Sequence, residues 1–148
     1  MVGLYWEDWE IGKEYISASR TITEADIVHF AGISGDYNPL HIDEEYCKKT
    51  IFGTRIAHGP LVYSIAAGLL FQLHLYDDTL IAFLGFDSLK FTKHVIAGDT
   101  ITAKISVIEK RETSKPDRGV MKRSLKVYNQ NNEMVQDAVQ AFLLKRKP

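Results

Sequence analysis

The sequence is poor in the features that mark secreted, membrane-spanning and nucleic-acid-binding chains. It has one cysteine, Cys47, so no intrachain disulfide is possible and a reducing, cytoplasmic setting is expected. The longest mostly apolar run, residues 59–73, is too short and too interrupted to span a bilayer, and no signal peptide is visible. The formal net charge is −1 without a long block of one sign, which argues against nucleic acid or an anionic membrane as a partner.

What is present is an ordinary globular composition. The 148 residues are 45% hydrophobic and 25% charged. A chain of this length suits one domain, 1–148, that buries about two thirds of the surface of its unfolded form. No internal repeat, linker or low-complexity segment divides it.

The strongest periodic pattern lies in the middle of the chain. Pro60 suits the first turn of a helix, and apolar residues then recur at helical spacing up to Leu73. The positions between them are also small or apolar, among them Ala67 and Gly68. Since a helix that is apolar nearly all round is buried, we expect a long central helix here.

Two shorter helices are expected ahead of the central one. Thr23, followed by Glu24 and Asp26, is typical of a helix start, and the apolar face behind it stops near Gly32. Asp43 can cap a second helix over residues 44–49, whose acidic first turn and basic last turn suit the helix dipole.

Period-two patterns predict five strands. The first covers residues 15–22, ahead of the helices, and the last four follow the central helix. These four cover residues 80–95 with a kink near Gly85, 100–107, 121–128 and 135–144, with a polar loop at 111–119. A buried helix followed by four strands in a meander indicates an α+β domain in which an antiparallel sheet wraps the helix. Because such a sheet leaves a face or an edge exposed, we expect a homodimer or a higher even oligomer.

Chemistry is concentrated in the stretch Ser34-Gly35-Asp36-Tyr37-Asn38-Pro39-Leu40-His41-Ile42-Asp43. Proline prevents a continuous helix, so we expect a compact loop that aims Asp36 and His41 at one point. A carboxylate and an imidazole suit proton transfer at neutral pH. The residue types fit equally well an Asx-type turn that caps the next helix, and both interpretations stay open at this level.

A second candidate lies at the start of the central helix, in His58-Gly59-Pro60. A helix N-terminus presents unpaired N–H groups, and Gly59 would let a substrate carbonyl approach them closely, as in an oxyanion hole. A plain capped helix start explains the same residues.

These motifs resemble those of a known family. The stretch 34–43, followed by Phe52-Gly53 and Ile56-Ala57-His58-Gly59, is similar to the hydratase motif of MaoC-like dehydratases, the (R)-specific enoyl-CoA hydratases. The similarity extends to Trp6-Glu7-Asp8, residues 20–26 and Gly98-Asp99-Thr100, and so covers nearly the whole chain. That family has the hot-dog fold, a sheet wrapped around a central helix, which agrees with the expected order of elements.

The resemblance implies roles for four residues. Asp36 and His41 match the family's catalytic pair. Asn38 matches a residue that helps hold the pair and its water, and Gly59 matches the backbone N–H that receives the thioester oxygen. The implied reaction is reversible syn addition of water to a trans-2-enoyl thioester, which gives the (R)-3-hydroxyacyl thioester. The implied substrate is an acyl-CoA or acyl-carrier thioester.

No cofactor and no metal is expected, since the five histidines (residues 29, 41, 58, 74 and 94) lack the spacing of metal ligands. His58 is expected to be structural and to orient the Gly59 turn, and His94 to be an exposed histidine at a strand end. Two rival functions stay open: a hot-dog acyl-CoA thioesterase and a non-catalytic acyl-thioester-binding protein.

Overall fold

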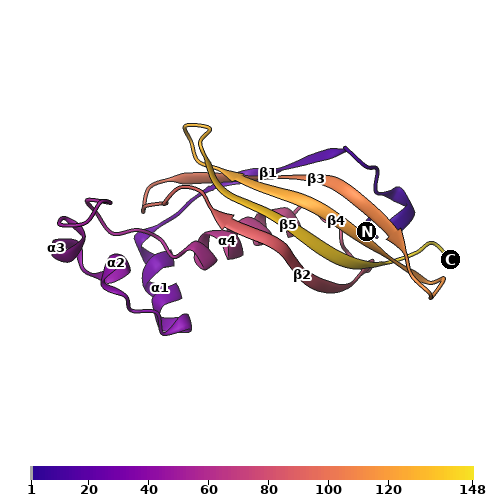
Figure 1. Cartoon of the computed structure of the whole chain (residues 1–148), viewed down its shortest axis with the longest axis horizontal. Helices are drawn as coiled ribbons and strands as arrows, with labels where there is room; N and C mark the ends of the chain where they lie inside the picture. Colours follow the sequence, from indigo (N-terminus) through magenta and orange to yellow (C-terminus); the bar gives the residue numbers. More distant parts are fainter. Residues whose placement is uncertain (1) are drawn as a thin grey trace.

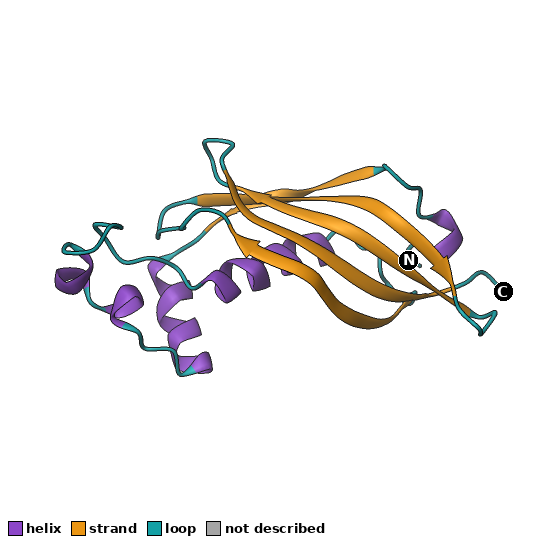
Figure 2. Ribbon diagram, in the orientation of Figure 1, coloured by secondary structure: helices purple, strands orange, loops and turns teal. Residues whose placement is uncertain are grey.

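The computed structural model describes residues 2–148, which form a five-stranded sheet and four α-helices (Figures 1 and 2). In chain order the elements are a short 3-10 helix η1 (Trp6–Asp8), β1 (Glu14–Thr21), α1 (Glu24–Ser34), α2 (Pro39–Ile42), α3 (Glu44–Cys47), α4 (Gly59–Phe71), β2 (Leu80–Phe91), β3 (Thr100–Glu112), β4 (Arg118–Tyr128) and β5 (Met134–Lys145). The expected α+β class and the central helix are confirmed.

The strands differ from expectation mainly at their ends. β2 stops at Phe91, whereas β3 and β4 continue through much of the predicted polar loop. They continue because Arg111 and Glu112 still pair with Val120 and Gly119, and polar side chains on an outer face do not interrupt a ladder. The kink predicted near Gly85 is confirmed, since Gly85 has φ 130° beside a shift in the register of β2.

The expected meander is wrong in one respect. The strand order is β1-β3-β4-β5-β2, so β2 pairs with the last strand, β5, and not with β3, which follows it in the chain. The chain therefore crosses two intervening strands between β2 and β3. Sequence alternation could not reveal this, because it shows that a strand has one buried face but not which neighbour it pairs with.

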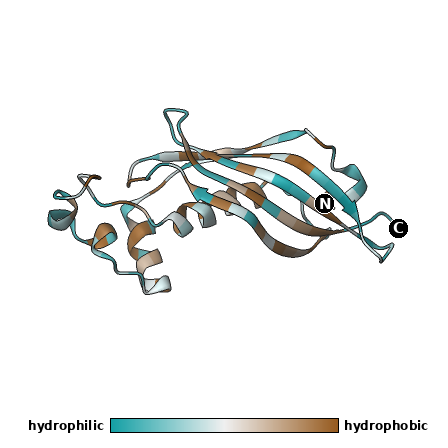
Figure 3. Cartoon of the chain, viewed as in Figure 1, coloured by the Kyte–Doolittle hydropathy of each residue, from teal (hydrophilic) through white to brown (hydrophobic). Residues whose placement is uncertain are grey.

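The apolar core lies between α4 and the inner face of the sheet, along which α4 runs in Figure 2. Buried side chains of α4 face buried ones of the strands, and hydrophobic and hydrophilic residues alternate along the strands in Figure 3. The helix contributes Leu61, Val62, Ala66, Leu69 and Leu70, and the strands contribute Ile101, Ala103, Ile105, Val107, Met121, Leu125, Val127, Ala138 and Phe142. No helix of residues 2–148 is both long and apolar enough to cross a membrane.

A chain of buried polar groups interrupts this core. Arg123 of β4 is 1% exposed, and its Nε donates to Oε1 of Gln140 on β5 at 2.8 Å. Its Nη1 donates to the hydroxyl of Tyr76, and Gln140 in turn donates to the hydroxyl of Tyr63 on α4 at 3.0 Å. No carboxylate of residues 2–148 pairs with Arg123. Burial lowers the pKa of Arg123 and raises that of Tyr76 to about 12.

Helices α1, α2 and α3 gather beyond one end of the sheet (Figure 1). An ion-pair cluster holds them to the loop that precedes α4, because the Arg55 guanidinium contacts Glu24 at the start of α1 and Glu44 at the start of α3. The hydrogen bonds from Arg55 and Thr54 hold the pKa of Glu44 below its ordinary value. The segment that carries the candidate chemistry is therefore fixed at both of its ends.

Candidate active site

The Asp36–His41 segment is built from local caps. Thr23 and Asp26 form the predicted capping box of α1, and the helix ends at Gly35, whose φ of 73° reverses the chain. Asp36 Oδ1 then accepts from the N–H of Asn38 at 3.2 Å. Asn38 Oδ1 accepts from the N–H of Leu40 at 3.0 Å, which makes Asn38 the N-cap of the one-turn helix α2. Both interpretations therefore hold: the segment forms an Asx-type cap, and it holds Asp36 and His41 in fixed positions. Its second half is a helical turn and not the loop that was expected.

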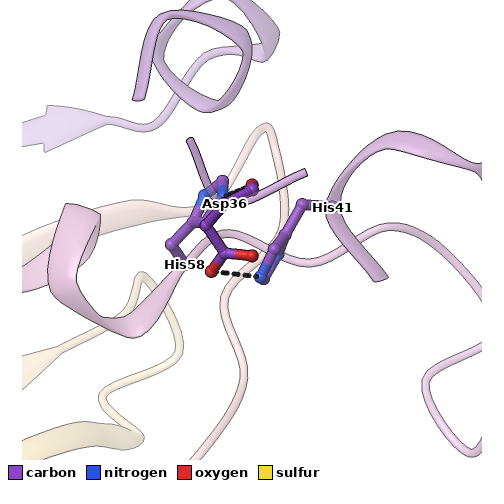
Figure 4. Close-up of side chains that lie close together, drawn as sticks. All are labelled: Asp36, His41 and His58. Carbon is purple, nitrogen blue, oxygen red and sulfur yellow. Dashed lines mark hydrogen bonds and ion pairs between the residues drawn. The ribbon is translucent and has the colours of Figure 1, made fainter. Parts of the chain in front are cut away.

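The carboxylate and the imidazole lie close together. Asp36 Oδ2 is 3.8 Å from His41 Nε2 (Figure 4). His41 Nδ1 donates to the carbonyl of Ile56 at 2.7 Å, because a peptide oxygen can only accept, so Nε2 carries the lone pair when the ring is neutral. A separation of 3.8 Å is too long for a direct hydrogen bond but allows one water to lie about 2.8 Å from both atoms.

His58 lies beside this pair, which the sequence did not show. The His58 ring stacks on that of His41 with centroids 3.6 Å apart, and its Nε2 donates to the backbone carbonyl of Asp36 at 3.0 Å. One potential ligand atom from each of Asp36, His41 and His58 lies within 4.8 Å of the others. Stacked imidazoles, however, direct their in-plane lone pairs side by side rather than toward one ion. The residues therefore do not fit a shared metal, and its expected absence stays a prediction.

Gly59 opens α4 at the edge of a cavity of about 220 Å³. His41, Gly59 and Val62 line this cavity together with Phe91 of β2. A Cβ on Gly59 would meet the Phe91 ring at 2.7 Å, so a larger residue there would have to displace that exposed ring. The structure thus brings Gly59 and His41 to one cavity.

Two other residues differ from expectation. Asn38 does not line this cavity, and its side-chain oxygen serves α2 as a cap. His94 is exposed, as expected, but it follows β2 in a loop instead of ending the strand; it packs edge-on against Phe52 and lines the cavity. Because the strand was expected to run to residue 95, the sequence did not indicate that His94 lies in a loop beside the cavity.

Comparison with known proteins agrees with the geometry. Residues 8–129 match the family described as MaoC like domain. The chain belongs to this family of MaoC-like dehydratases. It is 40% identical over 103 residues to the (R)-specific enoyl-CoA hydratase of Rhodospirillum rubrum, covering 70% of this chain and 69% of that protein. It is 39% identical to Protein MaoC of Klebsiella aerogenes over 77% of this chain, but spans only 33% of that longer protein.

Solved structures confirm the fold of this MaoC-like chain. The X-ray structure of a monoamine oxidase regulatory protein of Archaeoglobus superposes with a TM-score of 0.94 at 40% identity, covering 100% of this chain and 98% of the other. A Mycobacterium tuberculosis protein described as a double hotdogfold superposes with a TM-score of 0.86 at 24% identity, over 99% of this chain and 45% of its own. The expected hot-dog fold is therefore confirmed.

Proposed function

We propose that this MaoC-like protein catalyses the reversible hydration of a trans-2-enoyl-CoA to the (R)-3-hydroxyacyl-CoA. The observation that carries the proposal is the 3.8 Å gap between Asp36 Oδ2 and His41 Nε2. This gap has room for one water molecule between a carboxylate and an imidazole. His41, though not Asp36, lines the cavity that reaches Gly59 at the N-terminus of α4. The relatives named as enoyl-CoA hydratases support the same reaction class.

The geometry suggests how the reaction proceeds. A water between Asp36 and His41 loses a proton to one of them as its oxygen bonds to Cβ of the enoyl group. The π electrons move toward Cα, and the N–H of Gly59 at the helix N-terminus stabilises the charge that develops on the thioester oxygen. The pair then delivers a proton to Cα on the same face. The pair takes one proton from the water and gives one to Cα, so it ends the cycle with the same total number of protons.

The first experiment mixes the purified protein with crotonyl-CoA and follows the enoyl-thioester absorbance, with a thiol reagent in a parallel reaction. Loss of absorbance without free thiol, and formation of the (R)-3-hydroxy product, is the expected result. Release of free thiol would instead establish the acyl-CoA thioesterase. Binding without either change, detected as a thermal shift with crotonyl-, hexenoyl- and decenoyl-CoA, would indicate the non-catalytic acyl-thioester-binding protein.

Substitution of Gly59 tests the role of the helix N-terminus. Gly59→Ala is expected to lower kcat/KM for hydration by about tenfold or more, because the new methyl group meets the Phe91 ring and displaces the N–H from the thioester oxygen. The double variant Gly59→Ala/Phe91→Ala relieves that clash and is expected to recover part of the loss. Unchanged kinetics in folded Gly59→Ala would remove Gly59 from the mechanism.

The proposal includes a homodimer formed through β2, in the cytoplasm. β2 is an edge strand whose outer edge has no partner in residues 2–148. Apart from Phe91, which lines the cavity, four of its apolar side chains are exposed: Ile81, Phe83, Leu84 and Phe86. Light scattering is expected to give twice the chain mass, and Leu84→Lys, at the most exposed of these positions, is expected to shift the protein toward monomer. A monodisperse monomer at micromolar concentration would contradict this assembly.

A further inference from the structure

His58 occupies the N-cap position of α4 but does not cap that helix. An N-cap side chain normally accepts from a free N–H of the first turn, which is why serine, threonine, aspartate and asparagine are preferred there. The His58 side chain makes no such bond, and the residue is 1% exposed. The imidazole is therefore turned away from its own helix and contacts other parts of the chain.

One of these contacts fixes the backbone of Asp36. The His58 Nε2 donates to the carbonyl oxygen of Asp36, 22 residues earlier in the chain, at 3.0 Å. Since a carbonyl accepts only, Nε2 carries a proton. Nδ1 is buried and has no hydrogen-bond partner within residues 2–148. His58 thus has one ring nitrogen bonded and the other buried, and it does not line the cavity.

The other contact fixes the ring of His41. The two imidazoles stack with an interplanar angle of 26°, and Phe30 of α1 packs on His58 with centroids 5.0 Å apart. The carbonyl of Ile56, two residues before His58, accepts from the edge of the His41 ring. A single short segment therefore holds the edge and the face of His41, and the same His58 ring holds the backbone of its carboxylate partner (Figure 4).

We propose that His58 is a positioning residue that sets the separation between Asp36 Oδ2 and His41 Nε2. This inference rests on the proposed hydratase activity and goes beyond it, since His58 does not line the cavity. The gap of 3.8 Å suits one bridging water only while both groups keep their orientation. A displacement of about 1 Å in such a site lowers a rate by about a hundredfold.

Three substitutions of His58 distinguish its hydrogen bond to the Asp36 carbonyl from its stacking on His41. His58→Gln keeps an N–H donor near the place of Nε2 but removes the stacked ring, whereas His58→Phe keeps a ring and removes the donor. His58→Ala removes both. We expect kcat for hydration of crotonyl-CoA to fall by about ten- to a hundredfold in His58→Ala and by less in the other two, with KM changed by less than about threefold. His29→Gln, an exposed histidine on α1, is the matched control and is expected to stay within about twofold of wild type.

The result that overturns the proposal is a folded His58→Ala protein with kcat within about twofold of wild type, or one whose loss lies entirely in KM. If His58→Ala does not fold, the Gln and Phe variants decide, and near-wild-type kcat in both overturns it. A second test uses the His41→Ala background. There His58→Gln is expected to cause no further loss in the residual rate, because the ring it stacks on is gone. If His58→Gln lowered the residual rate as much in that background as it does in wild type, its effect would not act through His41, and the positioning role would be overturned.

Crystal structures of wild type and His58→Gln test the positioning role without depending on the proposed activity. The positioning role predicts that the His41 ring turns or becomes disordered in the variant, whether or not the wild type hydrates crotonyl-CoA. An unchanged His41 ring and an unchanged separation from Asp36 overturn the positioning role. An inactive wild type with a displaced His41 in the variant would instead contradict only the hydratase activity.

Discussion

Asp36→Asn is expected to lower the rate of enoyl-thioester hydration by at least about a hundredfold, the usual contribution of a general acid or base. The substitution removes the charge and the proton affinity of the carboxylate. It keeps an oxygen that can accept from the N–H of Asn38, so the turn that carries the residue should survive. His41→Ala is expected to cause a loss of the same order, since the water then lacks its second partner.

The matched control for this prediction is Asp43→Asn. Asp43 lies in the same stretch and caps α3 by accepting from the N–H of Tyr46 at 2.9 Å. Asparagine caps a helix about as well as aspartate, so the substitution removes a nearby carboxylate with little cost in stability. The assay is initial hydration rate with circular dichroism of each variant. A folded Asp36→Asn protein with activity near that of Asp43→Asn would rule out the proposed mechanism.

Gln140→Leu is expected to reduce the free energy of unfolding by about 3 kcal/mol, although it places an apolar residue in an apolar core. Gln140 is fully buried, and its carbonyl accepts from Nε of Arg123, which has no carboxylate partner in the part of the chain that the structure describes. Leucine leaves that buried cation with the Tyr76 hydroxyl and the Tyr76 and Phe142 ring faces as its main stabilising contacts. An unpaired donor on a buried charge costs more than the apolar contacts regain.

The double variant Arg123→Met/Gln140→Leu tests the cause. It removes the cation together with its acceptor, so its stability is expected to exceed that of Gln140→Leu alone. Urea denaturation of wild type, both single variants and the double variant gives the coupling energy. Additive single effects would mean that Arg123 and Gln140 do not depend on each other, against the bonded geometry.

Local chemistry explains which parts of the fold could be predicted. The central helix, the Thr23 capping box, the Asp43 cap and the kink at Gly85 each depend on residues a few positions apart. The partner of β2 could not be predicted, because pairing with β5 depends on residues 45 to 64 positions away that share the same alternation. The buried Arg123 was missed for a related reason, since its position in an alternating strand gives no sign that its partners are amides and hydroxyls.

In the candidate site too, the local features could be predicted and the long-range contacts could not. Asp36, His41 and Asn38 belong to one stretch whose turn residues imply that they lie close together. His58 was assigned only to the Gly59 turn, because nothing in the sequence shows that its ring reaches back 22 residues to Asp36. The roles of Asp36, His41, Asn38 and Gly59 in catalysis and binding remain predictions for the assays above.

The strand order also has a consequence for synthesis of the chain. Within residues 2–148, β2 pairs only with β5, which is made after β3 and β4, and β1 cannot pair until β3 has been made about eighty residues later. While the chain emerges from the ribosome, β2 and its exposed phenylalanines therefore have no partner strand until β5 has appeared. We expect folding of the sheet to be limited in rate by these long-range pairings, and the protein to need dilution or chaperones to refold well.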